Sequence, residues 1–149
     1  MKSKYHNKSC TVDGEKFASL AEARRYLELK SLKLAHKIKD FKTQPGFLLQ
    51  PAFRKCPECL HIQAHIPKSQ KKQDVMCHEC GTRTRVFEAI EYFADFLVVL
   101  ADGTEVIEDV KGSKGYQTDV FKLKHKIFES RFPDKTIRIV IMPPKRGKA

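Results

Sequence analysis

The sequence predicts an α/β fold in which helices flank a central mixed β-sheet. Three observations support this fold class. Residues 19–38 and 118–131 have the apolar periodicity of amphipathic helices, and residues 96–100 form a continuous apolar run that is typical of a buried strand. A last apolar strand, residues 136–142, follows the second helix. Because a helix that connects two strands of one sheet usually makes them parallel, the last strand is expected to be parallel to its neighbour.

Length and charge limit the class of protein. A chain of 149 residues with 41% hydrophobic residues can bury one substantial core and carry one small insertion. The formal net charge of +11 at pH 7 favours a polyanionic partner, and nucleic acid is the polyanion that fits best. Charge that serves only solubility is the alternative.

The sequence predicts no membrane segment. No stretch approaches the roughly 18 consecutive apolar residues that a transmembrane helix needs. The first residues lack the apolar region of a signal peptide. We therefore expect a cytoplasmic protein whose cysteines stay reduced.

Two elements are expected near the start of the chain. Residues 10–17 predict a hairpin with Asp13 and Gly14 in its turn. Ser19 and Glu22 have the spacing of a capping box, which begins a helix that we expect to end near residue 38. The apolar residues of this helix at helical spacing are Leu20, Ala23, Leu27 and Leu34.

The middle of the chain is expected to be extended. Residues 40–55 contain Pro45 and Pro51, which break a strand pattern. After a polar segment, strands are expected to resume over about residues 84–100 and, after a short turn that contains glycine, to return over residues 104–111. The apolar run within the first of these predicts a central strand that is covered on both faces.

The second helix is expected to begin after Thr118 and to end at Arg131, before Phe132 and Pro133. Its apolar stripe is formed by Val120, Phe121, Ile127 and Phe128. The same helix carries three lysines that are candidates for contact with phosphate groups, Lys122, Lys124 and Lys126. A solvated basic face explains these lysines equally well.

Four of the five cysteines form two knuckles, Cys56 with Cys59 and Cys77 with Cys80. Two such knuckles supply four thiolates in tetrahedral geometry, which suits structural zinc and leaves no open position for chemistry. Two disulfides or a redox pair are the alternatives. The sequence therefore predicts a zinc-ribbon insertion over residues 56–81, between the two parts of the core, residues 1–55 and 82–149.

The predicted ribbon is rich in basic residues. Its candidates for contact with DNA are Lys68, Lys71, Lys72, Arg83 and Arg85. The alternative is that these charges are only solvated. Because four cysteines already complete a zinc site, the histidines of the segment are expected to be surface residues. These are His61, His65 and His78.

Acidic residues interrupt the apolar strands on both arms of the second hairpin. Residues two apart on a strand share a face, so Asp109 and Lys111 are expected on one face and Glu108 on the other. A three-residue loop over 101–103 would place Asp95 directly opposite Asp109. A two-residue loop would shift the register by one and place Asp95 beside Glu108 instead.

Two carboxylates and a lysine on one face suit a hard divalent cation. Mg²⁺ takes carboxylate oxygens and keeps several waters. Lys111 would orient or deprotonate an attacking water or stabilise charge on a phosphate. Glu22 is a third candidate ligand, although glutamate at this position of a capping box often only caps. A surface salt bridge is the alternative, but it does not explain a carboxylate in the apolar run around Asp95.

The order of these residues resembles the PD-(D/E)XK nuclease family. Glu22 lies in an early helix, Ala94-Asp95 stands where the family has its Pro-Asp element, and Asp109-Val110-Lys111 matches the (D/E)XK element. Order and spacing are most similar to the junction-resolving endonuclease I of phages and to small related phage nucleases. Those proteins tend to have glutamate where this chain has Asp109, which makes Glu108 the alternative ligand.

The resemblance implies a restriction-endonuclease-like fold and Mg²⁺- or Mn²⁺-dependent hydrolysis of DNA. It implies that Glu22, Asp95 and Asp109 bind the metal and that Lys111 activates water or stabilises the phosphate. For a phage protein the expected location is the host cell cytoplasm. Branched DNA, such as a Holliday junction, is the expected substrate, and symmetric cutting of a junction calls for a homodimer.

Two alternatives to this function stay open. One is a nuclease for linear or single-stranded DNA in replication or transposition, which would share every catalytic residue. The other is a non-catalytic zinc-ribbon protein that binds DNA or regulates transcription.

Overall fold

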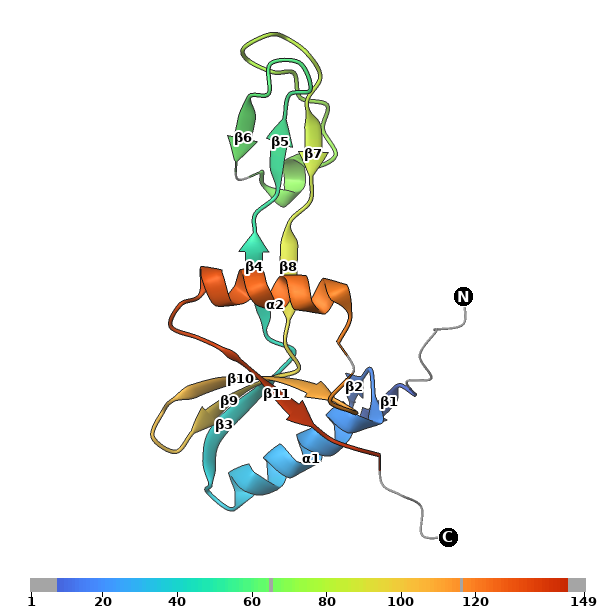
Figure 1. Ribbon diagram of the computed structural model, residues 1–149, viewed down its shortest axis with the longest axis vertical. Helices are drawn as coiled ribbons and strands as arrows, with labels where there is room; N and C mark the ends of the chain where they lie inside the picture. Colours follow the sequence, from blue (N-terminus) through green and yellow to red (C-terminus); the bar gives the residue numbers. More distant parts are fainter. Residues whose placement is uncertain (1–7, 65, 116, 145–149) are drawn as a thin grey trace. The chain divides into compact units, whose positions relative to one another are not determined.

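The computed structural model of the chain describes residues 8–64, 66–115 and 117–144. The chain forms two compact units (Figure 1). The first unit combines Met1–Pro45 with Phe93–Ala149, and the second unit is Gly46–Tyr92. In the described part of the chain, every helix is too short or too polar to cross a membrane.

The first unit is built on a four-stranded mixed sheet. Side by side, its strands are β11 (Ile137–Ile141), β10 (Glu105–Lys111), β9 (Phe96–Leu100) and β3 (Ile38–Thr43). β10 and β11 are parallel, whereas β9 is antiparallel to both β10 and β3. The predicted mixed sheet, the parallel last strand and the inner position of residues 96–100 are therefore confirmed.

The start of the chain folds largely as its turn and cap residues predict. β1 (Cys10–Val12) and β2 (Glu15–Phe17) form the expected hairpin, in which Asp13 has a φ of 52° and Gly14 a φ of 82°. The helix α1 (Leu20–Leu34) begins at the expected capping box. It ends earlier than expected, since His36 adopts a φ of 55° and the chain turns into β3.

The face of α1 that packs against the sheet differs from the predicted one. Ala23, Tyr26 and Leu29 are buried, and Tyr26 contacts the rings of Phe17 and Phe41. The predicted stripe was wrong for three of its members, which are exposed: Leu20, Leu27 and Leu34. Residues seven apart share one side of a helix, but the bulky aromatic contacts of Tyr26 turn a different side toward the sheet.

The helix α2 (Asp119–Arg131) follows β10 and precedes β11. Thr118 caps it as predicted, because its hydroxyl accepts a hydrogen bond from the N–H of Phe121 at 3.1 Å. Of the predicted apolar stripe only Phe128 is fully buried, and Val120 is exposed. Within the first unit, α1 and α2 lie on opposite sides of the sheet, as the predicted fold class requires (Figure 1).

The second unit consists of short strands. β4 (Gly46–Gln50) pairs with β8 (Ile90–Phe93), and β5 (Phe53–Lys55) is the middle strand of a three-stranded sheet with β6 (Ile62–Ala64) and β7 (Arg85–Phe87). A single 3-10 turn, η1 (Lys68–Gln70), follows β6.

The second unit contains more residues than the insertion expected over residues 56–81. Strands before the cysteines pair with strands after them, β4 with β8 and β5 with β7, and so belong to the same unit. Strands occur over residues 84–100 as expected. They are β7, β8 and β9, and only β9 belongs to the main sheet. Apolar residues recur through all three strands, so the sequence pattern alone does not mark the breaks between them.

Candidate active site and four-cysteine centre

The hairpin between β9 and β10 has the register that brings two carboxylates face to face. Val99 pairs with Glu105 and Phe96 with Glu108. The three-residue loop is closed by a hydrogen bond from the N–H of Leu100 to the carbonyl of Thr104 at 2.9 Å. Asp95 lies one residue before β9, and its N–H donates to the carbonyl of Glu108 at 3.1 Å, so it stays beside β10 near Asp109. The register predicted from a three-residue loop is confirmed.

Asp95 reaches across to the backbone of β10. One of its carboxylate oxygens accepts a hydrogen bond from the N–H of Val110 at 2.6 Å. Burial, and then the negative charge of Asp109, raise the pKa of Asp95 to about 7, although the Val110 hydrogen bond acts against this rise. Glu22 raises this pKa further and Lys111 lowers it. The other three residues that the sequence singled out therefore act electrostatically on the carboxyl group of Asp95.

Asp109 and Lys111 form the second half of this site. Asp109 is only 5% exposed, and its Oδ1 lies 2.5 Å from the Nζ of Lys111. The same ammonium group lies 4.4 Å from the centre of the Phe121 ring, on α2. This cation–π contact adds Phe121 to the site. Sequence analysis assigned Phe121 only to the apolar stripe of α2, and its spacing from Lys111 carries no signal of the contact.

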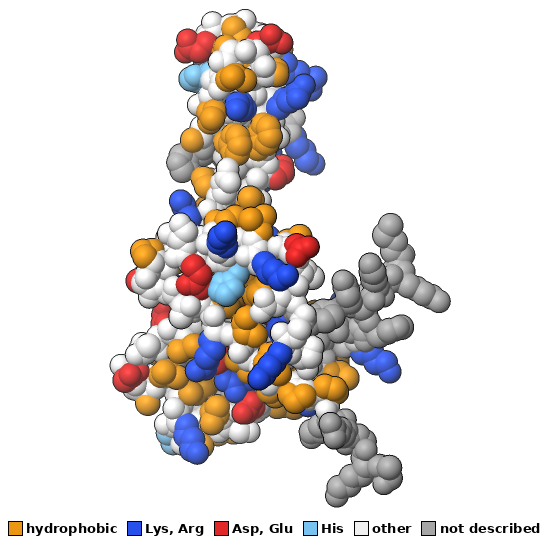
Figure 2. Space-filling view, viewed as in Figure 1, with side chains coloured by type: hydrophobic (Ala, Val, Ile, Leu, Met, Phe, Trp, Pro, Cys, Tyr) orange, Lys and Arg blue, Asp and Glu red, His pale blue; other side chains and the backbone are white. Residues whose placement is uncertain are grey.

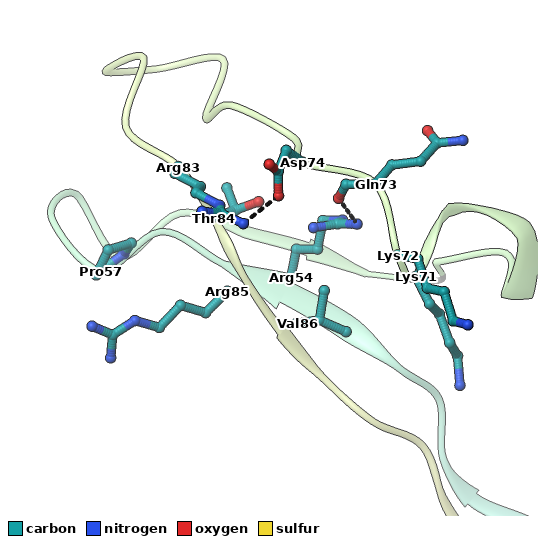
Figure 3. A pocket seen from close by; sticks show the side chains of 10 residues that line it. All are labelled: Arg54, Pro57, Lys71, Lys72, Gln73, Asp74, Arg83, Thr84, Arg85 and Val86. Carbon is teal, nitrogen blue, oxygen red and sulfur yellow. Dashed lines mark hydrogen bonds and ion pairs between the residues drawn. The ribbon is translucent and has the colours of Figure 1, made fainter.

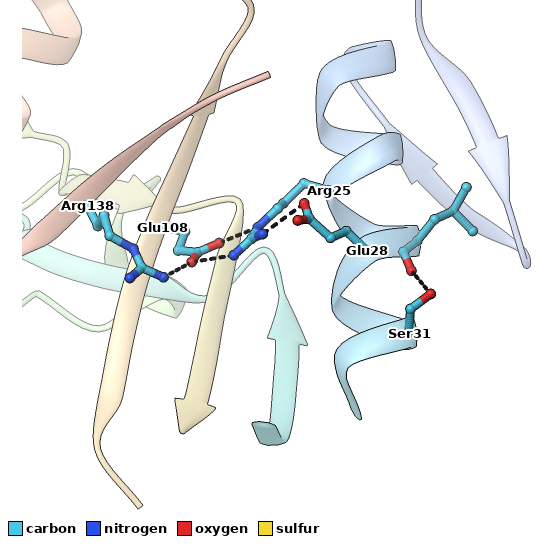
Figure 4. Close-up of polar contacts among 6 residues, drawn as sticks. Arg25, Glu28, Ser31, Glu108 and Arg138 are labelled. Carbon is cyan, nitrogen blue, oxygen red and sulfur yellow. Dashed lines mark hydrogen bonds and ion pairs between the residues drawn. The ribbon is translucent and has the colours of Figure 1, made fainter. Parts of the chain in front are cut away.

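Glu108 belongs to a different environment from its neighbour. It is fully buried, and its carboxylate accepts hydrogen bonds from Arg25 Nε at 2.9 Å and Arg25 Nη2 at 2.8 Å, and one from Arg138 (Figure 4). Burial acts to lower the pKa of Arg25, but its hydrogen bonds to Glu108 and Glu28 raise it overall. Two guanidinium groups already neutralise Glu108, so its position does not suit the alternative role of metal ligand.

Glu22 caps α1 and lies less close to the other two acids. Its carboxylate accepts hydrogen bonds from the N–H of Ala18 at 3.1 Å and from the hydroxyl of Ser19 at 2.8 Å. In the part of the chain that is described, Glu22, Asp95 and Asp109 do not gather with all their ligand atoms within 4.8 Å of one another. The pair Asp95 and Asp109 is thus the core of the site.

This pair fits a Mg²⁺ or Mn²⁺ ion by its chemistry. Mg²⁺ is commonly held by one or two carboxylates while it keeps several waters. Lys111 pairs with Asp109, but burial and the charge of Asp109 still raise the pKa of Asp95 to about 7, and a divalent cation would supply positive charge there in place of the proton.

Asp95→Asn is expected to stabilise the protein at high pH. The pKa of Asp95 in the folded chain lies above its ordinary value of 3.8, so its contribution to stability is fully present below about pH 4 and is lost as pH rises through about 7. Asparagine keeps an acceptor for the Val110 N–H but cannot ionise. Urea unfolding is measured without Mg²⁺ or Mn²⁺. Between pH 5 and pH 9, the free energy of unfolding of the variant should rise relative to that of the parent by on the order of 2 kcal/mol. Parallel pH profiles would contradict the burial of an ionisable Asp95.

The four cysteines of the second unit form a compact centre. In the described part of the chain they are the one group of three or more Cys, His, Asp or Glu residues whose ligand atoms all lie within 4.8 Å of one another. The sulfurs of Cys56 and Cys80 are 3.4 Å apart, as are those of Cys59 and Cys77. These distances exceed a disulfide bond and approach the roughly 3.8 Å edge of a tetrahedral site with zinc–sulfur bonds of about 2.3 Å.

The two knuckles have the same backbone geometry. In each, the N–H of the first cysteine donates to the carbonyl five residues later, that of His61 at 2.9 Å or that of Thr82 at 2.8 Å. The residue after each second cysteine has a positive φ, 65° at Leu60 and 74° at Gly81. Two matching loops that present four thiols inward make a closed centre that suits a structural metal.

The thiols of this centre interact strongly. Hydrogen bonds from the side chain and N–H of Thr82 lower the pKa of Cys80 to about 6. A backbone hydrogen bond at His61 acts to lower the pKa of Cys59, but contacts with the other thiols raise it to about 12. The thiol of Cys80 therefore ionises readily, whereas a thiolate at Cys59 needs a cation beside it.

Basic residues line a pocket of about 700 Å³ on the second unit (Figure 3). Its wall includes the predicted DNA contacts Lys71, Lys72, Arg83 and Arg85. Lys71 forms an ion pair with Glu88, and Arg83 forms one with Asp74. The side chain of Lys68 lies outside the described part of the structure.

Arg54 also lines this pocket and was missed by sequence analysis. It is buried and donates hydrogen bonds to the carbonyls of Gln70 and Gln73. Its position in a short strand between prolines gives no signal of this role, which is to hold the loop after η1.

The three lysines of α2 do not form a single row. Lys122 and Lys126 are exposed and lie four residues apart, which places them on one side of the helix. The Nζ of Lys122 also lies 3.4 Å from the Oδ1 of Asp119. Lys124 lies on another side and is half-buried. At most two of the three therefore share a surface that faces solvent.

Comparison with known proteins places the chain in a family. No curated protein and no solved structure gives a significant match. A family model described as "Protein of unknown function (DUF1064)" matches residues 2–147, nearly the whole sequence. The chain is therefore a member of the DUF1064 family.

Proposed function

We propose that this protein is a metal-dependent DNA endonuclease that uses Mg²⁺ or Mn²⁺ and selects branched DNA, such as a Holliday junction. The observation that carries the proposal is the approach of Asp95, which accepts a hydrogen bond from the Val110 N–H, to Asp109 beside Lys111. A carboxylate pair with a raised pKa next to an ammonium group is characteristic of a functional site.

Asp95 and Asp109 would hold the cation, with Glu22 as a third acid whose carboxylate must leave its capping contacts to join them. Burial and the charge of Asp109 raise the pKa of Asp95 to about 7, so a bound cation would replace its proton around neutral pH. When bound, the metal supplies Lewis-acid stabilisation of the phosphate and a more acidic water.

Lys111 is best placed to stabilise charge. Its ammonium group pairs with Asp109 and lies over the Phe121 ring. An ammonium group stabilises the negative charge that develops on the phosphate, whereas deprotonation of water requires a neutral amine. Of the roles predicted for Lys111, we therefore propose phosphate stabilisation.

The four-cysteine centre of the second unit would hold one structural Zn²⁺, and its basic pocket would contact DNA. The net charge of +11 supports a phosphate-rich partner. If the substrate is a four-way junction, two chains acting as a homodimer would place two sites on the symmetric strands.

A panel of substrates tests the proposal. Four-way junction, flap, nicked, linear duplex and single-stranded DNA of matched sequence are incubated with the zinc-loaded protein, with Mg²⁺, with Mn²⁺ or with neither. We expect cleavage only with added metal and fastest on the junction. Fastest cleavage of linear or single-stranded DNA would redirect the proposal to replication or transposition. Tight binding without any cleavage would favour a non-catalytic DNA-binding protein.

A further inference from the structure

The three-stranded sheet of the second unit has an exposed face that the proposed active site does not use. Strands β6 and β7 both pair with β5, and residues two apart on a strand share a face. The side chains on this face, named the aromatic–basic face, are Phe53, Lys55, Ile62, Ala64, Arg85 and Phe87. Arg54 lies on the opposite face of the sheet by strand alternation, and Arg85 is the member of the aromatic–basic face that also borders the basic pocket lined by Arg54.

The first row of the aromatic–basic face is apolar. The rings of Phe53 and Phe87 are stacked, with centres 4.8 Å apart and planes inclined by 5°. Phe87 is 44% exposed, and Ile62 beside this row is 54% exposed. Figure 2 shows apolar and basic side chains adjoining one another on the second unit. Parallel rings that leave apolar surface in water offer a platform for a flat ligand.

The second row is cationic. Lys55 and Arg85 lie directly opposite each other on β5 and β7. Neither forms an ion pair with any residue in the described part of the chain. Figure 3 shows Arg85 extending away from Arg54 and Gln73. Like charges opposite each other destabilise an antiparallel pair, and a bound anion would remove this cost.

We propose that the aromatic–basic face binds single-stranded nucleic acid, with bases stacked on Phe53 and Phe87 and phosphates held by Lys55 and Arg85. The two rows are two residues apart on the strands, about 7 Å. Single strands present both flat bases and phosphates, and proteins bind them with aromatic side chains beside basic ones. A duplex hides its base faces, and an acidic peptide does not need stacked rings. Unpaired nucleotides at branched DNA would be the natural target, but the inference concerns binding and does not depend on cleavage.

Binding of a fluorescent oligo(dT) of about ten nucleotides tests the aromatic row. Anisotropy is measured on the zinc-loaded protein without Mg²⁺ or Mn²⁺, so the result is independent of nuclease activity. Phe87→Leu is expected to weaken binding of the oligonucleotide about tenfold, because it removes a stacking ring but keeps an apolar side chain. Phe87→Tyr retains a ring and should bind like the parent. Phe87→Leu should lower the affinity for a matched duplex by less than about twofold, because a duplex offers no free bases to stack.

Arg85→Gln tests the cationic row. It should weaken binding and lower the slope of log Kd against log salt by about one. Phe93→Leu, at an exposed phenylalanine (61%) outside the face, and Lys42→Gln, at an exposed lysine of β3, are the matched controls and should leave binding unchanged. Zinc content and circular dichroism confirm that each variant is folded. Unchanged oligonucleotide binding by folded Phe87→Leu, or equal losses in the controls, would overturn the proposal.

Discussion

Asp109→Asn is expected to abolish metal-dependent cleavage of DNA while the chain stays folded and still binds DNA. The change removes one of the two facing carboxylates that would hold the cation. Loss of several kcal/mol of metal-derived stabilisation corresponds to a fall in rate on the order of 10³. The variant also loses a negative charge that opposes ionisation of Asp95 and approach of phosphates, so DNA binding should be equal or tighter. Single-turnover cleavage and equilibrium binding, measured side by side, separate the two effects.

Glu108→Gln is the matched control, one residue away on the opposite face. It leaves Arg25 and Arg138 facing a neutral amide at a fully buried position, so a loss of stability of about 3 kcal/mol is expected. Cleavage per folded molecule should stay near that of the parent. Lys111→Ala should lose cleavage per folded molecule, because it removes the ammonium that stabilises the phosphate.

The opposite ranking would be decisive against the assigned site. If Glu108→Gln abolished cleavage per folded molecule while Asp109→Asn cut normally, Glu108 would be the ligand despite its two arginine partners. If all three variants cut as well as the parent, the chain would not be a nuclease of this kind.

The sequence allowed the core of this site to be predicted because its geometry is local. The loop over residues 101–103 determines the register of a hairpin, and strand alternation then determines that Asp95 and Asp109 share a face. Cap residues Ser19 and Thr118 were also predictable, since an N-cap depends on residues within one turn. The pairing of two cysteine knuckles rests on spacing alone in the same way.

The parts that could not be predicted depend on contacts between distant segments. Nothing near Glu108 in the sequence indicates that arginines from α1 and β11 neutralise it. The contact of Phe121 with Lys111 likewise requires knowledge of how α2 returns to the sheet. Leu27 of α1 was predicted to face the sheet but is exposed. Helical periodicity identifies residues that share one side of a helix, but it does not determine which side packs against the sheet.

Cys77→Ser is expected to unfold the second unit and to leave the first unit folded. Cys77 is buried, and its sulfur is 3.4 Å from that of Cys59. With three thiolates, bound zinc should fall from about one per chain to well below half, because a closed structural site needs all four ligands. The second unit has only short strands to replace this crosslink. The core of the first unit is formed by its own side chains, including Phe17, Leu29 and Phe96, and does not use the metal.

Hydrogen exchange and zinc analysis, on the variant and the parent, measure the outcome. Amide protection should be lost in β5, β6 and β7 and kept in β9 and β10. Cys10→Ser is the matched control, because Cys10 is a half-buried cysteine of β1 that lies outside the four-cysteine centre. It should keep one zinc and full protection in both units. Retention of one zinc and of protection in β5 by Cys77→Ser would mean that packing, and not a metal, holds the second unit together. Loss of protection in β9 and β10 as well would mean that the two units fold as one, and that the centre stabilises the sheet carrying Asp95 and Asp109.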